Sequence, residues 1–450
     1  MEKIKLNAAN SQIRYSWLVL FLGIILLGCV ILSGAVSAAT STPVTKNLAD
    51  QDHPVVYGNN VVWTDYRNDK SSDNNPDIYM KNLKTGKESP VCTAKHEQTS
   101  PAIYGNKVVW TDGRNGKYQI GVVNNYDIYM KDLKTGAVTR VTTNQYSQTQ
   151  PAIYGNMVVY VDNRLDVAKG GDGFTGDIYL KNLVTGKEIP ICTNPSEQYF
   201  PKIYGNIIVW EDFRNGGSLA IPDIYMYNLL THKQTRLVSG GGRPSIYGNL
   251  VVYESINSKG YNGIKMINII TKRITTLTSN VQASNPAIYG DLVTWDTLVN
   301  RLYVKNIKTG KLTLISNKGR SGELYANRLI WVDNRNGNDD IYTTTFDIYP
   351  PKVVSTDPVN KAVNVAPNKI IKIKLSERVQ KGNMFIELKN SAGKSVKIIK
   401  TISGNVLTIK PVSILSNGKY TLVLHTGSLK DMAGYSLGRY STVFTVKRTR

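Results

Sequence analysis

The pattern of apolar and polar positions recurs along most of the chain and predicts short β-strands. One copy contains Lys107-Val-Val-Trp-Thr111, an apolar β-branched run that predicts a strand. Asp127-Ile-Tyr-Met-Lys131 follows and alternates polar and apolar residues, as a half-buried strand does. Gly-Asn before the first run and Lys-Thr-Gly after the second are strong turn signals. Together with the flanking segments, these runs predict a unit of four short strands.

The same unit recurs seven times, marked by a tyrosine and a second aromatic residue six positions later. The leading tyrosines are Tyr57, Tyr104, Tyr154, Tyr204, Tyr247, Tyr289 and Tyr325. Their aromatic partners are Trp63, Trp110, Tyr160, Trp210, Tyr253, Trp295 and Trp331. Four strands at a period of about 36–50 residues predict the blades of a β-propeller.

The two ends of the repeat region predict how the ring closes. The seventh copy supplies only three strands, the last of them at Asp340 to Thr345. Pro43-Val-Thr-Lys-Asn47 resembles the outer strand Arg140-Val-Thr-Thr-Asn144 of another copy. We therefore expect residues 43–48 to complete blade seven and lock the ring of a propeller spanning residues 41–346, which pairs a strand that would otherwise present a free edge.

A longer string, Asp-Ile-Tyr-x-x-(Asn/Asp)-Leu-x-Thr-Gly, stands at residues 77–86, 127–136 and 177–186. It resembles the TolB-type propeller repeat, also called the WD40-like PD40 repeat. Copies five and six depart from it, with Gly263-Ile264-Lys265 and Arg301-Leu302-Tyr303. The resemblance implies a propeller over about three hundred residues. It implies activity only weakly, because such propellers serve as binding platforms, assembly parts and, less often, lyase scaffolds.

A second region begins after the repeats. Residues 347–351 end in Pro350-Pro351 and predict a stiff linker. Beyond it, strand-like runs separated by turn residues predict a β-sandwich over residues 352–450. Its segments resemble the SbsA-type bacterial Ig-like domain, at residues 355–358, 364–368, 374–378, 403–409 and 431–434. The resemblance implies a spacer or attachment module without chemistry.

The first forty residues read as an export signal. Lys3, Lys5 and Arg14 precede an apolar run from Trp17 to Leu32, and small residues up to Ala39 follow. This order is typical of a secretory signal peptide cleaved after Ala38 or Ala39. The alternatives are an uncleaved anchor at residues 17–39 and, as a minor one, a lipobox at Leu26 to Cys29. Each places residues 41–450 outside the cytoplasm, at the cell surface or in the extracellular space. The predicted fold class is therefore all-β: a seven-bladed β-propeller followed by an Ig-like β-sandwich, preceded by a signal or transmembrane helix.

The net charge of +22 is concentrated near the C-terminus. Residues 351–450 contain 18 Lys and Arg against 4 Asp and Glu, whereas residues 41–350 contain 34 against 28. This distribution does not predict nucleic-acid binding. It favours contact of the C-terminal module with anionic wall polymers or lipid headgroups, or it serves solubility alone. Three Cys and four scattered His exclude a disulfide-built scaffold and predict no metal site and no cofactor.

An Asp-x-Arg pair after the second strand is the strongest repeated polar signal. It comprises Asp65 and Arg67, Asp112 and Arg114, Asp162 and Arg164, Asp212 and Arg214, and Asp333 and Arg335. One hypothesis is that these groups ring one mouth of the propeller and bind an anionic or sugar ligand. The other is that they hold each blade together, as repeated residues in repeat proteins usually do. In the copies at Glu254 and Asp296 the pattern is interpreted as lost.

Two further sequence features bear on chemistry. Cys92 and Cys192 occupy equivalent positions with one blade between them, so we expect buried free thiols. The acidic run Asp333 to Asp340 has oxygen ligands for Ca²⁺ but lacks the spacing of a calcium loop, which favours a solvated turn.

These features predict a non-enzymatic extracellular or cell-envelope protein. The propeller would be the recognition platform and the basic domain a wall attachment or spacer. Its expected partners are surface proteins or anionic cell-wall polymers, with membrane contact only through an uncleaved N-terminal segment. The alternative is a carbohydrate-active lyase or hydrolase acting at one propeller mouth, which would require a non-repeated acid–base set. His53 and His96 are the candidates for such a set.

Overall fold

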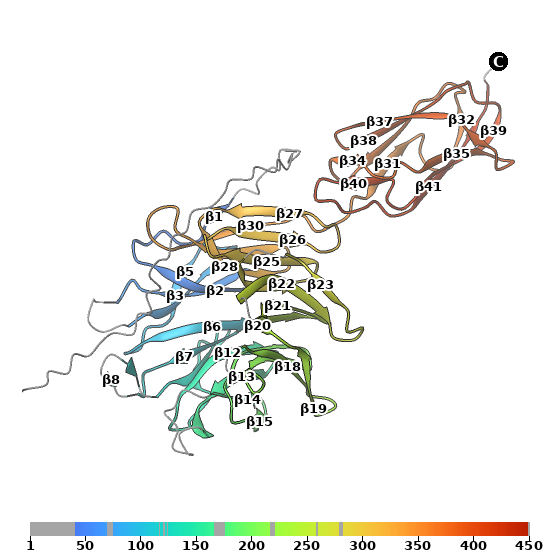
Figure 1. Ribbon diagram of the computed structural model, residues 1–450. Coiled ribbons are helices and arrows are strands. Elements are labelled where there is room, and N and C mark those ends of the chain that lie inside the picture. Colours follow the sequence, from blue (N-terminus) through green and yellow to red (C-terminus); the bar gives the residue numbers. More distant parts are fainter. Residues whose placement is uncertain are drawn as a thin grey trace, which may run out of the picture. The chain divides into compact units, whose positions relative to one another are not determined.

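The computed structural model describes residues 41–69, 75–116, 118–119, 122–123, 125–165, 176–216, 221–257, 260–278 and 282–448. These residues form an all-β structure (Figure 1). The expected signal peptide or anchor at residues 1–40 lies outside this set. Within it, no helix is both long and apolar enough to span a bilayer.

Seven four-stranded antiparallel sheets form the blades of a propeller. In the first blade the order is β2 (Gln51–Tyr57), β3 (Asn60–Asp65), β4 (Asp77–Asn82) and β5 (Glu88–Cys92).

Blades two to four repeat this order. They comprise β6 (Gln98–Tyr104), β7 (Lys107–Asp112), β10 (Asp127–Asp132) and β11 (Val138–Arg140); β12 (Gln148–Tyr154), β13 (Met157–Asp162), β14 (Asp177–Asn182) and β15 (Glu188–Cys192); and β16 (Gln198–Tyr204), β17 (Ile207–Asp212), β18 (Asp223–Asn228) and β19 (Lys233–Val238). A small ribbon, β8 (Tyr118–Gln119) with β9 (Val122–Val123), belongs to the long loop of blade two.

Blades five and six have the same order. They comprise β20 (Gly241–Tyr247), β21 (Leu250–Asn257), β22 (Gly260–Asn268) and β23 (Ile274–Thr276), and then β24 (Ala283–Tyr289), β25 (Leu292–Thr297), β26 (Leu302–Asn306) and β27 (Leu312–Ser316).

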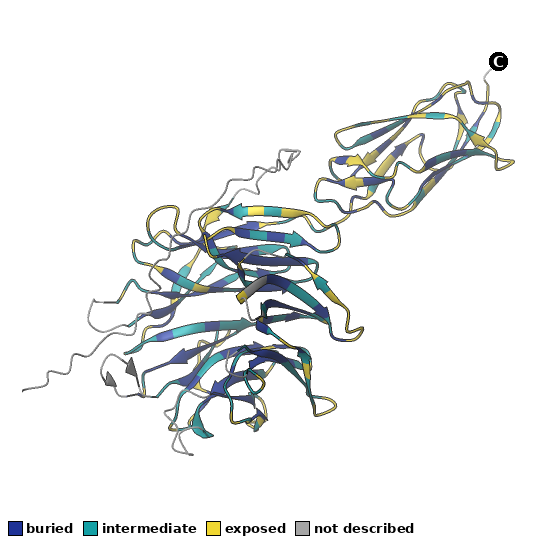
Figure 2. Ribbon diagram, in the orientation of Figure 1, coloured by how far each residue is buried: buried dark blue, intermediate teal, exposed yellow. Residues whose placement is uncertain are grey.

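The hydrophobic core lies between neighbouring blades rather than within one sheet. The second strand of each blade is buried along nearly its whole length, as Figure 2 shows in dark blue. Trp63 is fully buried and packs in a cluster that joins blade one to residues of blade seven, including Ile330 and Val332. Because each sheet is covered on both faces, its central strand tolerates only the continuous apolar pattern that the sequence contains.

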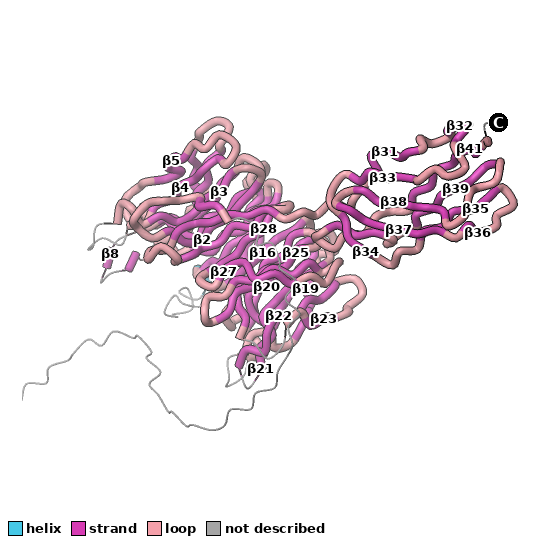
Figure 3. The backbone as a smooth tube through the Cα atoms, turned by 90° about the horizontal axis from the view of Figure 1, so that it is seen from above, coloured by secondary structure: helices cyan, strands magenta, loops and turns pink. Residues whose placement is uncertain are grey.

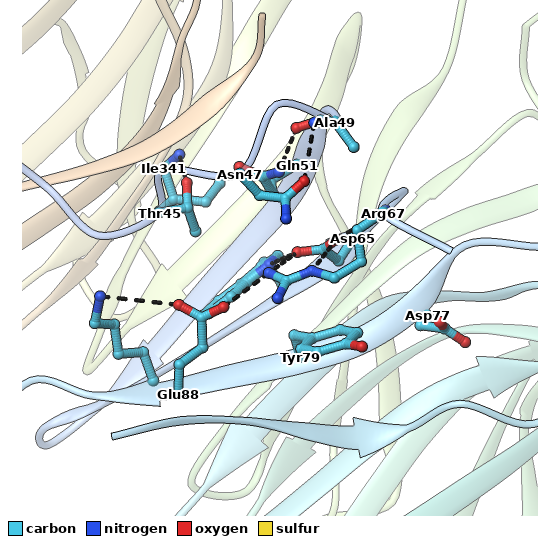
Figure 4. Close-up of polar contacts among 12 residues, drawn as sticks. Thr45, Asn47, Ala49, Gln51, Asp65, Arg67, Asp77, Tyr79, Glu88 and Ile341 are labelled. Carbon is cyan, nitrogen blue, oxygen red and sulfur yellow. Dashed lines mark hydrogen bonds and ion pairs between the residues drawn. The ribbon is translucent and has the colours of Figure 1, made fainter. Parts of the chain in front are cut away.

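Blade seven is assembled from both ends of the propeller region. Its sheet has the order β1 (Thr42–Pro43), β30 (Asp340–Thr345), β29 (Arg328–Asp333) and β28 (Gly319–Tyr325). The pairing continues beyond the regular strand, where Val44 N–H donates to the Ile341 carbonyl at 2.7 Å. Ile341 N–H donates to Thr45 Oγ1 at 2.8 Å, and Figure 4 shows these two residues. Val44 is 1% exposed and joins the core between blades seven and one. The outer edge of β30 is therefore covered by the chain's own N-terminal segment.

The C-terminal region is sandwich-like and built from strands β31 to β41 (Figure 3). One sheet has the order β31 (Val353–Asp357), β33 (Ile371–Leu375), β38 (Val406–Pro411) and β37 (Ile398–Ser403). The other has β32 (Ala362–Val365), β41 (Tyr440–Val446), β39 (Gly418–Leu424), β35 (Ile386–Asn390) and β36 (Ser395–Val396), and β34 (Val379–Lys381) pairs with β40 (Leu429–Asp431). Strand β33 alternates buried isoleucines with exposed Lys372 and Lys374, so its lysines face solvent as expected.

The closing segment predicts a stability difference that a pair of variants can measure. Val44→Ala removes two buried methyl groups from the core between blades seven and one, so we expect the free energy of unfolding to fall by about 2 kcal/mol. Leu48→Ala is the control, since Leu48 belongs to the same segment but is 93% exposed, and its effect should stay within about 0.5 kcal/mol. Urea unfolding followed by tryptophan fluorescence reports mainly on the propeller, because five of the six tryptophans lie in residues 41–346 and none lies in residues 347–450. Equal effects of the two substitutions would contradict a structural role for the closing segment.

Candidate functional site

Each blade has a bulge in its innermost strand. In β2 the ladder with β3 runs from Asp52 opposite Thr64 directly to Val55 opposite Val62, so two residues of β2 stand opposite one of β3. The second bulged residue is Pro54, which has no N–H to donate and would interrupt a regular ladder. The same register shift occurs in the other six inner strands. In blade seven Gly322 takes the place of the proline.

The first bulged residue has a positive φ in all seven blades. The seven residues are His53, Ser100, Gln150, Phe200, Arg243, Asn285 and Ser321, with φ between 45° and 52°. This left-handed region is unfavourable for residues other than glycine and asparagine, and only one of the seven is an asparagine. Bulges and residues with such backbone conformations are frequent beside binding and active sites. The backbone is therefore repeated around the ring, while the side chain that it presents differs from blade to blade.

The seven bulge residues line one mouth of a cavity of about 420 Å³ on the propeller axis. A second cavity of about 410 Å³ lies at the other end of the axis, and Lys202 and Glu323 line both. Because Gln51 pairs with Asp65, the mouth and the loops after the second strands lie at the same face of the propeller. This is the face on which the sequence placed the ligand site.

Two charged residues break the symmetry of the channel wall. The residue after the bulge proline is small or apolar in five blades: Val55, Ala102, Ala152, Ser245 and Ala287. In blades four and seven it is Lys202 and Glu323. These blades are three positions apart, the greatest separation in a ring of seven, so the two charges face each other across the channel. Burial raises the pKa of Glu323, and the positive charge of Lys202 lowers it. Neither side chain has a hydrogen bond or a salt bridge with the other residues that the structure describes.

Three buried acids on blades four to six support the same mouth. Glu211, Glu254 and Asp296 accept hydrogen bonds from the bulge N–H groups of the following blade, those of Arg243, Asn285 and Ser321.

The Asp-x-Arg pattern is lost in blades five and six, as the sequence indicated, but Glu254 and Asp296 do not stand at the position of its aspartate. The register places Ser255 and Thr297 at the position of the repeated aspartate. Glu254 and Asp296 stand one position earlier, so they are additional acids and do not replace the aspartate. Burial raises the pKa of Glu211 to about 7, although the Arg243 N–H opposes this. Its carboxyl group therefore changes charge near neutral pH.

Arg243 connects these groups at the rim of the mouth. Its guanidinium donates to Asn285 Oδ1 at 2.7 Å, lies 3.8 Å from Glu254 and stands 5.0 Å from the centroid of the Phe200 ring. Arg243 therefore links blades four, five and six while its side chain stays 47% exposed. A partly exposed arginine held in this way can bind an anionic or planar group.

The opposite end of the channel is encircled by the seven leading tyrosines. Neighbouring rings lie 4.4–5.1 Å apart between centroids, and the pair Tyr325 and Tyr57 closes the circle. Burial and the adjacent tyrosines raise the pKa of Tyr204 to about 12, so its phenol stays neutral at physiological pH. Because the tyrosine positions are identical, this end of the channel offers much less chemical variety than the mouth.

The Asp-x-Arg residues predicted as ligand-binding are engaged within their blades. Asp65 is fully buried and accepts hydrogen bonds from the Trp63 indole at 2.7 Å, from the Arg67 backbone at 2.9 Å, and from the Arg67 guanidinium at 2.8 and 2.6 Å. Arg67 also stacks on Tyr79 and pairs with Glu88, as Figure 4 shows.

Four further blades repeat the Asp–Arg ion pair and the stacking of the arginine on a tyrosine, with Asp112 and Arg114, Asp162 and Arg164, Asp212 and Arg214, and Asp333 and Arg335. None of these ten residues lines the axial cavity. Their contacts hold the strands of each blade together, and ligand binding by them stays a prediction.

The cysteines that the sequence analysis named lie as predicted, whereas the two histidines do not form a pair. Cys92 and Cys192 are buried free thiols, as predicted, and the Arg114 and Arg214 guanidiniums lie 2.8 and 2.9 Å from their sulfur atoms. Burial raises the pKa of the Cys92 thiol to about 11. His53 is a bulge residue and lines the mouth, whereas His96 does not line it. The two histidines are therefore not brought together at one site.

Comparison with known proteins identifies one family and a shared fold. Residues 347–446 match the bacterial Ig-like domain. No curated protein sequence matches the chain. Among solved structures, oligogalacturonate lyase from Vibrio parahaemolyticus is 12% identical, with a TM-score of 0.52 over 70% of this chain and 95% of that one.

Two further solved structures are similar at the same low level of identity. The β-propeller domain of the trilobed protease from Pyrococcus furiosus is 13% identical, with a TM-score of 0.52 over 66% of this chain and 94% of that one. TolB from Acinetobacter baumannii is 17% identical, with a TM-score of 0.38 over 51% of this chain and 55% of that one. At these identities the likeness to the oligogalacturonate lyase and to the propeller domain of the trilobed protease shows the β-propeller fold alone.

The Asp-x-Arg pairs within the blades predict that the stability of the propeller depends on pH. Burial opposes ionisation of Asp333, but hydrogen bonds from Arg335, Ser316 and Trp331 outweigh it and lower the pKa to about 2. The unfolded chain binds this proton at a pKa of about 3.9, so the stabilisation is complete above that value and is lost as the pH falls toward 2.

We expect the difference in unfolding free energy between the wild type and Asp333→Asn to shrink by about 2 kcal/mol between pH 5 and pH 2.5. Urea titrations of both proteins at the two pH values measure it. A difference that does not depend on pH would contradict the assigned ion pair.

Proposed function

We propose that the protein is a non-enzymatic cell-surface or extracellular binding protein whose ligand enters the mouth of the propeller channel. One observation carries the proposal: seven equivalent bulges present seven side chains that are chemically varied, including imidazole, amide, aromatic, guanidinium and hydroxyl groups. Residues that only maintain a repeat tend to repeat with it, as the Asp-x-Arg pairs do. Variation of the side chain at a backbone position that is both repeated and strained therefore supports a role of these residues in recognising a ligand.

The strain at the bulges supports binding by a preorganised surface. A residue other than glycine in the left-handed region costs on the order of 1 kcal/mol or more, and the closed ring supplies the packing that holds each one there. Pairs such as Glu211 with the Arg243 N–H fix the backbone further. A ligand would therefore meet side chains whose positions are largely set before binding, which reduces the entropy lost on association.

The charges of the channel indicate the chemistry of the ligand. Lys202 offers an ammonium group and Glu323 a carboxylate on opposite walls, with small residues between them. Arg243 adds a guanidinium at the rim. A ligand segment that carries an anionic group and a nearby amine or hydroxyl would complement these groups. Wall polymers and protein segments exposed on the cell surface both contain such combinations, and they are the partners that we propose.

The C-terminal module is proposed to attach the protein to the cell surface through its positive charge. Its net charge is +14, and Lys372, Lys374 and Lys410 are exposed on one sheet of the sandwich. Such a surface attracts anionic polymers over a distance of about 8 Å at physiological salt. This attachment does not need chemistry of its own, which agrees with the role implied by the Ig-like domain.

A lyase or hydrolase is the second candidate, favoured by Lys202 and Glu323 as a non-repeated base and acid in one cavity. The experiment is an assay of the full chain on acidic polysaccharides, with Lys202→Ala and Glu323→Gln beside it. Turnover by the wild type that is lost in both variants would replace the binding proposal with an enzymatic one. Failure of the wild type to turn over any of the polymers would support binding alone.

The proposed mouth predicts which arginine controls affinity. Arg243→Ala removes the guanidinium at the rim, and we expect binding to the recognised member of a panel of wall glycans and surface proteins to weaken about tenfold or more. Arg273→Ala is the matched control, because Arg273 is exposed in the turn between β22 and β23 and does not line the cavity. Equilibrium binding of the three proteins measures the effect. Equal affinities would place the ligand elsewhere than the mouth.

The proposed attachment predicts release by salt. Raising the ionic strength from about 0.1 to 1 M shortens the Debye length from about 10 to 3 Å, so washing intact cells should release the protein if charge holds it. Combined substitution of Lys372, Lys374 and Lys410 by glutamine should lower the salt concentration at which half of the protein is released. Immunoblots of wash and pellet measure both effects. Retention at 1 M salt would instead favour an uncleaved N-terminal helix.

A further inference from the structure

Three carboxylates converge in the Ig-like region, away from the propeller channel. They belong to Asp347 in the linker of residues 347–351 (the connector below), Glu377 in the loop between β33 and β34, and Asp431 at the end of β40. One oxygen from each lies within 4.8 Å of the others. Asp347 is exposed, Glu377 is intermediate and Asp431 is buried, so the group extends from the surface into the domain.

The charge balance of the domain makes this convergence informative. Residues 351–450 contain only four acidic residues against 18 Lys and Arg. Asp357 pairs with Lys369 at 2.7 Å, and Glu387 pairs with Lys389 at 3.0 Å and His425 at 2.7 Å. Among the described residues, by contrast, Asp347, Glu377 and Asp431 form no salt bridge with any Lys, Arg or His. The remaining two acids of a strongly basic domain therefore face each other and a third carboxylate.

The deepest of the three carboxylates has an unsatisfied oxygen. Asp431 is 0% exposed, and its Oδ1 accepts the Tyr435 N–H at 2.8 Å. Its Oδ2 has no hydrogen-bond partner among the described residues. A buried carboxylate oxygen without a partner is costly, and such groups in native proteins are normally paired or coordinate a metal. This oxygen is an observation independent of the clustering itself.

We propose that Asp347, Glu377 and Asp431 bind a calcium ion that fastens the connector to the Ig-like domain. Carboxylate oxygens are the ligands of hard cations, whereas a zinc site would need cysteine or histidine. Ca²⁺ accepts six to eight oxygens in flexible geometry, including bidentate carboxylates and waters, so three carboxylates of differing exposure suit it better than the strict octahedron of Mg²⁺. Extracellular calcium modules bind with dissociation constants of about 10⁻⁴–10⁻³ M, and this is the affinity that we expect.

The alternative occupant of the cluster is a proton. Burial and the adjacent Asp347 carboxyl raise the pKa of Glu377 to about 7. A shared proton would relieve the repulsion between these two residues without any metal. Calcium titrations at pH 8, where a proton competes less, distinguish the two possibilities.

The test is calorimetric titration of the metal-stripped full chain with CaCl₂ at pH 8. The wild type should bind with a dissociation constant of about 10⁻⁴–10⁻³ M. Asp347→Asn and Glu377→Gln should each weaken that binding about tenfold or more, while both proteins keep the wild-type circular dichroism spectrum. These two positions avoid the buried Asp431, whose replacement could impair folding.

Asp357→Asn is the matched control, since it neutralises an exposed acid of the same domain that is paired with Lys369. It should leave calcium binding unchanged. The proposal is overturned if the wild type binds no calcium up to 10⁻² M (about tenfold above the expected range), or if binding survives both substitutions unchanged. A parallel titration with MgCl₂ should give weaker binding, and tighter binding of magnesium would also contradict the site.

Discussion

The pairing of Thr42 to Thr45 with β30 is the constraint on which the rest of the structure depends. An open row of seven sheets would leave β30 with an unpaired edge and would expose the apolar face that Val44 now covers. Once the N-terminal segment supplies this fourth strand, every blade has a neighbour on both sides, and the aromatic residues of the second strands are buried. A closed ring also fixes the seven inner strands around one axis, which is the condition for a channel with a defined mouth.

The propeller combines repeated residues that hold its blades together with varied residues that line its mouth. The Asp-x-Arg pairs recur in five blades, tryptophan occupies the same buried position in five, and the tyrosine circle includes all seven. The contacts of these residues are made within the propeller. The bulge residues use the same backbone geometry but different side chains. Lys202 and Glu323 add two opposite charges at a position that is otherwise small. A rigid repeated frame with a variable rim is an economical way to build a specific pocket, because a change at the rim leaves the frame intact.

Much of the fold could be predicted from the sequence because the repeat displays its own period. The six-residue spacing from Tyr104 to Trp110 and the turn signals define the strands. The missing strand of blade seven pointed to residues 43–48, whereas the structure pairs residues 42–45 with β30. The site was harder to predict. The strong repeated signal of Asp65 and Arg67 drew attention to residues that the structure shows to be internally paired.

The bulge residues vary and so show no motif, although the invariant position before Pro101 or Pro151 would have marked them. The carboxylates of Asp347, Glu377 and Asp431 are too far apart in sequence to suggest proximity without coordinates.

The central claim is that the mouth, rather than the blade rims, contacts the ligand. Hydrogen–deuterium exchange of the full chain, with and without solubilised cell-wall fragments, tests it most directly. The account predicts slower exchange in peptides that contain the bulges, such as residues 98–102 and 241–245, and unchanged exchange in the outer turns. Protection confined to the outer turns or to residues 352–448 would contradict it.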